Sequence, residues 1–357
     1  MTISDYRIEK RTDVGAIGLF MQALIAITLA FVASGLLLTI LGFDPVAAFD
    51  ALHKGAFGTW RNAQGSLIHA APLAFTGVAA AVAFRARIWS IGQEGQFFAG
   101  AMMAYFFTTF LNLPALIMVP LVILAGALGG GLMGGLSGTL KTRFNVNVVV
   151  STVMLNYIIV YLLSYLLTSR IWMAPGEYYL QTDRIPKNAR LPDLWPETDL
   201  HLGVVLAVLT IIGLHFLINH TTFGFSLRAF GDNAVAAHFK GVAPKRMTLI
   251  VLTLSGALAG LGGVVQSFGV DFRLSQTFLY GHGSAGLIVA VIAGLRPLSI
   301  GLVAFLFGAL AKGGLFMQVM ADISSAMIST MQAIILMFFL VTSVLFQYRL
   351  RRISQDV

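Results

Sequence analysis

The stretch FGFSLRAFGDNAVAAHFKGVAPKR, residues 223–246, is the polar interruption around which this otherwise apolar chain is organised. A helix can begin after Asp232 or Asn233, because a short side-chain oxygen accepts hydrogen bonds from the first N–H groups of a helix. The next seven residues are mostly good helix formers. Gly241 suits the left-handed position after the last turn, and Pro244 prevents the helix from continuing. We therefore expect a helix of one or two turns between two apolar segments.

Basic side chains surround this short helix at Arg228, Lys240, Lys245 and Arg246. A structured, basic helix between two membrane spans suits the docking of a soluble partner. An ordinary basic loop that binds anionic lipid headgroups has the same composition. From the residues alone, both interpretations stay open.

The composition of the chain indicates a membrane protein. Of its 357 residues, 57% are hydrophobic and only 11% charged, and the mean hydropathy is +0.85. A soluble domain carries about 25% charged residues, so this chain cannot cover its surface with polar groups. The net charge of +8 comes from basic residues scattered at the ends of apolar runs, which is typical of membrane proteins and not of nucleic-acid binding. The absence of cysteine excludes disulfides, thiolate metal sites and cysteine nucleophiles.

Apolar runs predict an all-α polytopic membrane protein with about ten transmembrane helices, since a span needs about 20 apolar residues. A polar linker is expected at residues 42–65. The first run is too long for the core of a signal peptide, so we expect it to be retained. The ten predicted spans are residues 17–41, 66–84, 96–111, 113–136, 146–167, 200–218, 247–268, 284–295, 298–320 and 326–346.

Basic residues predict the orientation, because cytoplasmic loops carry an excess of Lys and Arg. Fifteen of the 23 Lys and Arg residues fall on one side of the predicted spans and seven on the other, while Lys312 lies inside a span. Both termini are therefore expected in the cytoplasm. A single transmembrane domain, 1–357, would then have a cytoplasmic N-terminal tail (1–16), an external loop (168–199), a cytoplasmic loop (220–246) and a cytoplasmic C-terminal tail (347–357).

Two glycine-broken segments, IGQEGQ at residues 91–96 and GHGSAG at residues 281–286, stand five spans apart. Helices separated by five spans run in opposite directions, and interrupted helices at matching places in two inverted halves indicate a transport pathway. Alternatively, the glycines only allow helices to pack closely. Close packing is the role expected for the glycines of residues 126–138.

Polar residues inside the apolar segments are candidates for the wall of such a pathway. A charge at this depth costs at least about 2.5 kcal/mol, so it must face water, another polar group or the interior of a helix bundle. Lys312 could instead reach the membrane surface, and Asn156 could instead join two helices by a hydrogen bond. The candidate pathway residues are Glu94, Gln96, Asn156, Gln266 and Lys312.

Sequence motifs for several chemistries are missing. The chain contains no GxxxxGK[ST] loop for ATP phosphates and no HExxH or other metal-spaced cluster. No serine–histidine–aspartate or paired-carboxylate arrangement stands out. We expect no enzyme activity, no metal and no cofactor.

Three blocks of this sequence resemble the permeases of ATP-binding cassette (ABC) importers. They are FRARIWSIGQEGQFFAGA (84–101), LKTRFNVNVVVSTVMLNY (140–157) and LRAFGDNAVAAHFKGVAPKRMTLIVLTLSGALAGLGG (227–263). The resemblance covers nearly the whole chain and is to the branch for simple sugars, nucleosides and branched-chain amino acids, closest to the nucleoside and simple-sugar permeases. The chain departs from that pattern at Asn233–Ala234, where the family often has Asn-Pro, and at Lys312, because the corresponding span is usually less charged.

The resemblance implies a bacterial inner-membrane subunit with several partners. These are a cytoplasmic ABC ATPase with tandem domains, a second permease subunit in a heterodimer and an external substrate-binding protein, besides membrane lipid and without nucleic acid. The ATPase would dock on the helix at residues 231–241. The residues implied in coupling are Arg228, Gly231, Asp232, Asn233, Ala236, Lys240 and Gly241.

Other functions remain compatible with the residues. One is a secondary transporter driven by an ion gradient, with Glu94, Asp271 or Lys312 changing protonation. Another is a scaffold subunit without a pathway. A third is an ABC permease for branched-chain amino acids.

Overall fold

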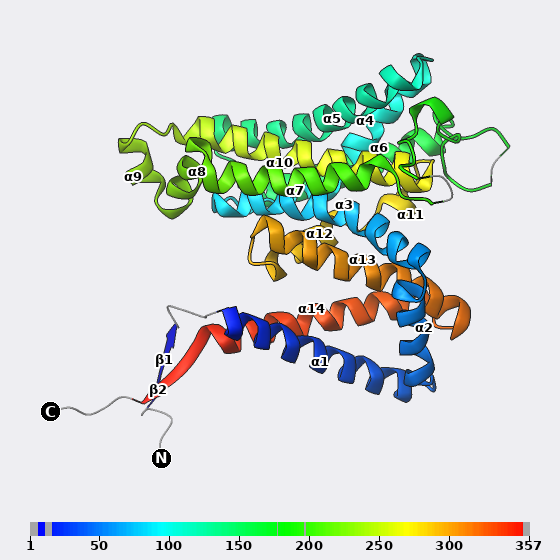
Figure 1. The fold of residues 1–357 in the computed structure, drawn as a ribbon. Coiled ribbons are helices and arrows are strands. Elements are labelled where there is room, and N and C mark those ends of the chain that lie inside the picture. Colours follow the sequence, from blue (N-terminus) through cyan, green and yellow to red (C-terminus); the bar gives the residue numbers. More distant parts are fainter. Residues whose placement is uncertain (1–5, 11–15, 177, 196–197, 353–357) are drawn as a thin grey trace. The chain divides into compact units, whose positions relative to one another are not determined.

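The computed structural model describes residues 6–10, 16–176, 178–195 and 198–352 and divides the chain into two compact units. One unit comprises residues 1–55 and 313–357, and the other comprises residues 56–312. Figure 1 shows that nearly all of the described elements are helices.

The larger unit contains most of the helices. They are α3 (Trp60–Arg85), α4 (Gln93–Phe110), α5 (Ala115–Phe144), α6 (Val148–Thr168), a 3-10 helix (Lys187–Ala189), α7 (Leu202–His220), α8 (Thr222–Asp232), α9 (Ala234–Phe239), α10 (Pro244–Gln266), a π-helix (Ser267–Asp271), α11 (Gln276–Leu279), α12 (His282–Ile292) and most of α13 (Pro297–Met320).

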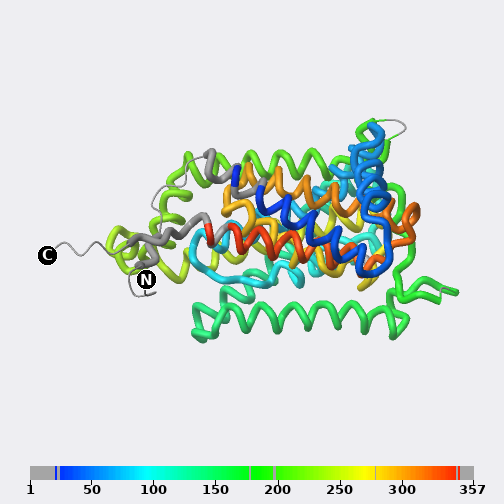
Figure 2. Tube along the Cα trace, turned by 90° about the horizontal axis from the view of Figure 1, so that it is seen from below, coloured from blue at the N-terminus to red at the C-terminus, as the bar shows by residue number. Residues whose placement is uncertain are grey.

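The smaller unit is built around α1 (Ala16–Ile40) and α14 (Ser325–Gln347), which lie side by side in both Figure 1 and Figure 2. The helix α2 (Pro45–Phe57) follows α1 in the chain. Its Ala48 belongs to a small apolar cluster with Leu38, Met317 and Met331. The strands β1 (Tyr6–Lys10) and β2 (Tyr348–Arg352) pair antiparallel. Both strands lie in segments that were predicted to be tails, and every other described element is helical, as the all-α prediction expects.

The prediction of a linker at residues 42–65 is wrong in part, because this segment contains α2 and the first turns of α3. The Asp44 carboxylate accepts a hydrogen bond from the Val46 N–H at 2.8 Å, and Pro45 takes the first helical position, where a missing N–H costs nothing. Asp50 and Lys54 form an ion pair at 2.6 Å one turn apart. Local capping and this i,i+4 pair favour a helix that hydropathy alone does not reveal.

Each of the ten predicted spans falls on a helix, but the helices differ in length and polarity. Among the described residues, seven helices are long and apolar enough to cross a membrane: Trp60–Arg85, Ala115–Phe144, Val148–Thr168, Leu202–His220, Pro244–Asp271, Pro297–Met320 and Ser325–Thr342. Two apolar stretches, Ile25–Ile40 and His282–Ile292, are shorter. The first turn of α4 is polar, with Gln93, Glu94 and Gln96.

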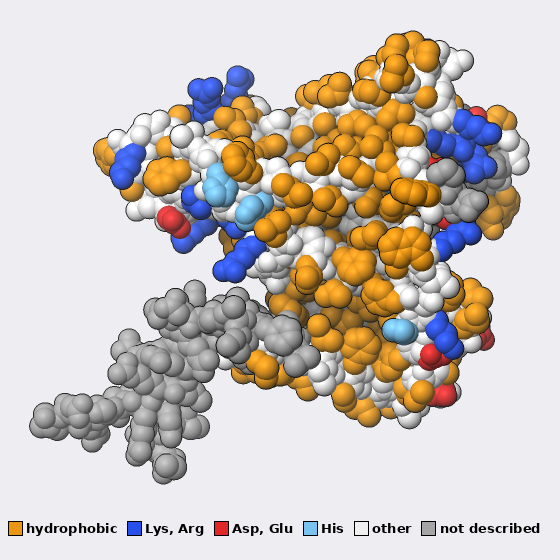
Figure 3. Space-filling view, in the orientation of Figure 1, with side chains coloured by type: hydrophobic (Ala, Val, Ile, Leu, Met, Phe, Trp, Pro, Cys, Tyr) orange, Lys and Arg blue, Asp and Glu red, His pale blue; other side chains and the backbone are white. Residues whose placement is uncertain are grey.

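The surface of the larger unit has the distribution expected of helices in lipid. In Figure 3, hydrophobic side chains cover the middle of its helices, and Lys and Arg side chains gather at the two ends, one of them the end that carries α8 and α9. Leu116, Leu124, Leu128 and Leu132 on α5 are more than half exposed, and lipid is the solvent in which such a surface is stable.

Glycines bring α10 into backbone contact with α5. A Cβ atom added at Gly130 would overlap the carbonyl oxygen of Gly256, and one added at Gly260 would overlap that of Gly126. The prediction that the glycines of residues 126–138 serve close helix packing is therefore confirmed. In lipid, where apolar burial drives little helix association, such backbone proximity maximises van der Waals contact.

Candidate functional site

The segment that precedes α4 is held by two polar side chains of α6. The Ile91 N–H donates to the Thr152 hydroxyl at 3.2 Å. Asn156 uses both ends of its amide: its oxygen accepts from the Gly95 N–H at 2.8 Å, and its nitrogen donates to the Ile91 carbonyl at 2.7 Å. Asn156 therefore has the helix-to-helix hydrogen bonds that were one interpretation of this residue, and it fixes where α4 begins.

The two glycine-broken segments meet each other. Gly281 has a φ of +95° and precedes α12, a conformation that glycine adopts without steric cost. The Glu94 carboxylate accepts hydrogen bonds from the Gly281 N–H at 2.5 Å and the Ser284 N–H at 2.9 Å, one on each oxygen. A Cβ atom at Gly283 would overlap the backbone of Glu94. The start of α12 therefore rests directly on the start of α4.

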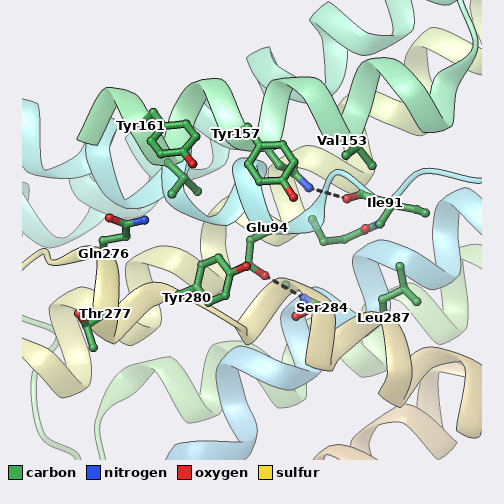
Figure 4. Close-up of a pocket in the computed structure, with 14 residues that line it drawn as sticks. Ile91, Glu94, Val153, Tyr157, Tyr161, Gln276, Thr277, Tyr280, Ser284 and Leu287 are labelled. Carbon is green, nitrogen blue, oxygen red and sulfur yellow. Dashed lines mark hydrogen bonds between the residues drawn. The ribbon is translucent and has the colours of Figure 1, made fainter. Parts of the chain in front are cut away.

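A pocket of about 570 Å³ lies beside this junction, between α4, α6, α11 and α12. Tyr157 and Tyr161 on α6 are both more than half exposed and stack at a centroid distance of 6.3 Å. Figure 4 shows both rings pointing from α6 towards the side where Glu94, Tyr280 and Gln276 lie. Gln276 is anchored by the Ser164 hydroxyl at 2.7 Å.

The lining of the pocket combines aromatic faces with amide and hydroxyl groups. Aromatic rings provide a large apolar surface against which a flat or ring-shaped solute can stack. A few placed polar groups fix the orientation of such a solute. Among the described lining residues, none is Lys, Arg or His. The pocket can therefore accommodate a neutral polar ring compound.

The structure brings together only some of the predicted pathway residues. Glu94 and Asn156 both line the pocket, whereas Gln96, Gln266 and Lys312 do not. The Gln266 amide donates to both oxygens of Asp271, at 3.2 and 3.1 Å, where α10 passes into the π-helix. The aliphatic chain of Lys312 lies over Gly65, whose added Cβ would stand 2.7 Å from the lysine Cε.

Several lining residues were not anticipated from the sequence. Tyr157, Tyr161, Tyr280 and Gln276 all line the pocket. A spacing of four residues between Tyr157 and Tyr161 places both rings on one helical face, and this signal could have identified them. Nothing in the local sequence of Tyr280 or Gln276 relates them to α6, which is more than a hundred residues earlier.

The loop around the short predicted helix has the local structure expected. Asn233 caps α9, and its side-chain oxygen accepts from the Val235 and Ala236 N–H groups, each at 3.0 Å. Gly241 has a φ of +90°. Pro244 does more than end a helix, because it occupies the first turn of α10.

The remaining residues of this loop face in two directions. Gly231 is buried so closely that an added Cβ would overlap the Arg85 carbonyl oxygen. Asp232 is exposed and 3.9 Å from Arg87. Arg228, Ala236 and Lys240 are exposed as well. Val235 and Phe239 are 67% and 86% exposed, so α9 presents apolar side chains on a surface surrounded by charge.

A second depression, of about 610 Å³, lies next to this loop. It is lined from the α3–α4 connection by Arg87 and Trp89, from the last turn of α5 by Lys141, and from the α8–α9 junction by Gly231 and Ala234. Three parts of the chain at the same end of the larger unit thus form one surface with basic and aromatic side chains.

Comparisons with known proteins assign the chain to a family. Residues 62–341 match the model of the family described as "Branched-chain amino acid transport system / permease component". A guanosine ABC transporter permease of Bacillus subtilis is 33% identical over 88% of this chain and 91% of its own length. A nucleoside ABC transporter permease of Lactococcus lactis is 30% identical over 81% and 82%. A glucose ABC transporter permease of Haloferax volcanii is 25% identical over 97% and 93%. No solved structure matches the chain.

Proposed function

Since the chain belongs to the branched-chain amino acid transport system permease family, we propose that it forms half of the membrane pathway of an ABC importer for a nucleoside or a simple sugar. The family consists of transporter permeases and not of enzymes. The chain is a multi-pass inner-membrane protein that works with a cytoplasmic ATPase and a substrate-binding protein.

The observation that carries the substrate proposal is the similarity to guanosine and nucleoside permeases over most of both chains. The pocket beside Glu94 supports it, because Tyr157, Tyr161 and Tyr280 offer faces for a base or a sugar ring. Gln276 and Ser284 offer polar groups for the exchangeable hydrogens of either solute. We place this pocket in the wall of the pathway.

The proposed topology retains ten spans with both termini in the cytoplasm and two inverted halves. The seven long apolar helices support it. The shorter α12 and the polar start of α4 would be the two broken helices, one in each half. Their N-termini meet at Glu94, as expected of interrupted helices that line a pathway.

Coupling to the ATPase is proposed to run through α9 and its neighbours. Val235 and Phe239 supply apolar contact area, and Arg228 and Lys240 supply charge around it. Gly231, in the last turn of α8 just before α9, packs against Arg85 and Ala86 at the end of α3, where the α3–α4 connection towards Glu94 begins. A displacement of α9 would reach the pocket by a short, packed route. A tandem-domain ATPase and a second, different permease subunit complete the proposed assembly.

Uptake into proteoliposomes tests the function. The complete importer, with its ATPase, second permease subunit and binding protein, is expected to accumulate radiolabelled guanosine only with ATP. Uptake by this chain alone under a proton or sodium gradient would overturn the proposal in favour of a secondary transporter. ATP-driven uptake of leucine without guanosine or glucose would overturn the substrate class alone.

The coupling role has its own test in Ala236→Glu, which places a charge among the apolar residues of α9. We expect guanosine uptake to fall about tenfold while ATP hydrolysis persists, because a central contact of the docking surface is lost. Ala47→Glu adds the same charge at an exposed alanine of α2 and should leave uptake unchanged. Normal coupled uptake by Ala236→Glu would remove α9 from the docking surface.

A further inference from the structure

The start of α12 is an anion-binding site that the protein fills with its own carboxylate. The N-terminus of a helix attracts anions through its free N–H groups and its dipole. In α12 the Gly281 and Ser284 N–H groups point at Glu94, which lies in the first turn of α4. Two helix N-termini therefore converge on one carboxylate.

Two opposing effects act on the charge of Glu94. Burial favours the neutral acid, whereas each of its two oxygens accepts a hydrogen bond from a backbone N–H, and such bonds favour the ionised carboxylate. Among the described lining residues no Lys, Arg or His offsets this charge. A negatively charged solute that entered the pocket would meet a carboxylate and find the helix N-terminus already occupied.

A second observation points to a ligand at the same place. Gln93 lines the pocket and is only 1% exposed, yet neither its amide nitrogen nor its amide oxygen has a hydrogen-bond partner among the described residues. A buried amide without partners is destabilising, so such a group is usually satisfied by something that binds. An amide donates and accepts equally, and thus suits a hydroxyl group or the edge of a base.

We propose that Glu94 is a charge filter: by occupying the N-terminus of α12, its carboxylate lets the pocket bind neutral polar solutes and reject their phosphorylated forms. Gln93 supplies the hydrogen-bonding group for the neutral solute. This inference rests on the proposed function, because it takes the pocket as part of the pathway for a nucleoside or sugar.

Equilibrium binding of solutes to the permease–ATPase complex tests the filter. The binding protein is left out, so that its own selection among solutes does not contribute to the result. The probes are guanosine with guanosine 5′-monophosphate, and glucose with glucose 6-phosphate. For the neutral solute that binds, we expect the wild-type complex to bind the phosphorylated form at least about tenfold more weakly. Glu94→Gln, which keeps the size of the side chain and removes the charge, should abolish this preference.

Two controls complete the experiment. Glu94→Asp keeps the charge and should keep the preference. Asp271→Asn removes a carboxylate of the same unit that does not line the pocket and should keep it too. The filter is overturned if the wild type binds the phosphorylated form as tightly as the neutral one, if Glu94→Gln keeps the preference, or if no neutral probe binds. Uptake by the complete importer is measured separately, so the filter can fail while ATP-driven uptake persists.

Discussion

Glycine allows close backbone approach in two regions of the larger unit, the contact between α5 and α10 and the junction between α4 and α12, but the two contacts differ in kind. Between α5 and α10, Gly130, Gly256 and Gly260 remove side chains so that two backbones touch. At the other junction, Gly283 brings the start of α12 against the backbone of Glu94, and the Glu94 carboxylate accepts a hydrogen bond from the Gly281 N–H there. The first contact is apolar and made of many small attractions, whereas the second depends on a few hydrogen bonds beside a pocket.

Because of this difference, we expect the α5–α10 contact to be a rigid part of the fold and the α4–α12 junction to be part of the functional site. A close-packed backbone contact has no alternative arrangement of similar energy, because any separation loses many van der Waals contacts at once. The hydrogen bonds that Glu94 accepts from Gly281 and Ser284 can be exchanged for bonds to water at little net cost. We therefore expect α5 and α10 to move as one body and the α4–α12 junction to be where the pathway responds to its solute.

The largest effect is expected from Gly130→Ala, because the new methyl group would collide with the Gly256 carbonyl oxygen, a backbone atom. Overpacking of this kind costs about 3 kcal/mol. The melting temperature of the purified protein in detergent measures it. Gly131→Ala is the matched control, since its nearest neighbour would stand 3.6 Å away, an ordinary contact. Equal melting temperatures for the two variants would contradict the rigid contact.

A smaller effect on stability, with a clear effect on transport, is expected from Asn156→Ala. The variant leaves the Gly95 N–H and the Ile91 carbonyl without their partner, which costs about 2 kcal/mol. Because these bonds position Glu94, guanosine uptake by the complete importer should fall more than assembly does. Asn156→Asp keeps the acceptor for Gly95 and should be less impaired. Unchanged uptake kinetics in Asn156→Ala would mean that these hydrogen bonds do not position Glu94 for transport.

His201 is a third place where glycines make room, this time for a polar ring. The ring is buried against Gly203 and Gly269 at the start of α7, and burial lowers the pKa of His201 to about 4. The folded protein therefore binds fewer protons than the unfolded chain between pH 6.5 and 4, so stability falls as pH falls through this window.

The resulting loss between pH 7 and pH 5.5 is roughly 1 kcal/mol. Melting temperatures at the two pH values measure it, and His201→Gln should show a smaller difference between them than the wild type. Carboxylates that titrate in the same window act equally on both proteins. A pH dependence that is identical in the variant would mean that folding does not lower the pKa of His201.

The smallest effect is expected from Arg87→Ala. Arg87 and Asp232 approach within 3.9 Å, but their side chains are 70% and 83% exposed, and such exposed pairs contribute less than about 0.5 kcal/mol. Melting temperature should barely change. Uptake is the informative measurement, because Arg87 lines the depression beside α9, and reduced uptake at unchanged stability would extend the docking surface to it.

Much of the fold could be predicted from the chain itself. Apolar runs located the helices because lipid requires each span to satisfy its own backbone hydrogen bonds. Asn233 and Gly241 predicted α9 because capping depends only on neighbouring residues. The start of α2 depends equally on local capping, by Asp44 and Pro45, but a search for long apolar runs overlooks it.

The site was predictable only in part, since Glu94 and Asn156 stood out as polar residues within apolar segments. Their partners did not stand out. Gly281 lies 187 residues from Glu94, and Gln276 lies 112 residues from Ser164. Conversely, Gln266 and Lys312 were also predicted as pathway residues because they are polar residues within apolar segments, but they do not line the pocket.

The amino-acid sequence is enough to identify a helical membrane protein of a permease family, to locate its helices and to explain how its short α9 is capped, because these properties depend on composition and on residues within a few turns of each other. That Glu94 occupies the start of α12 and that three tyrosines line one pocket is visible only in three dimensions. Such groupings depend on how distant helices pack, and the spacing of residues along one helix carries no information about which other helix it meets.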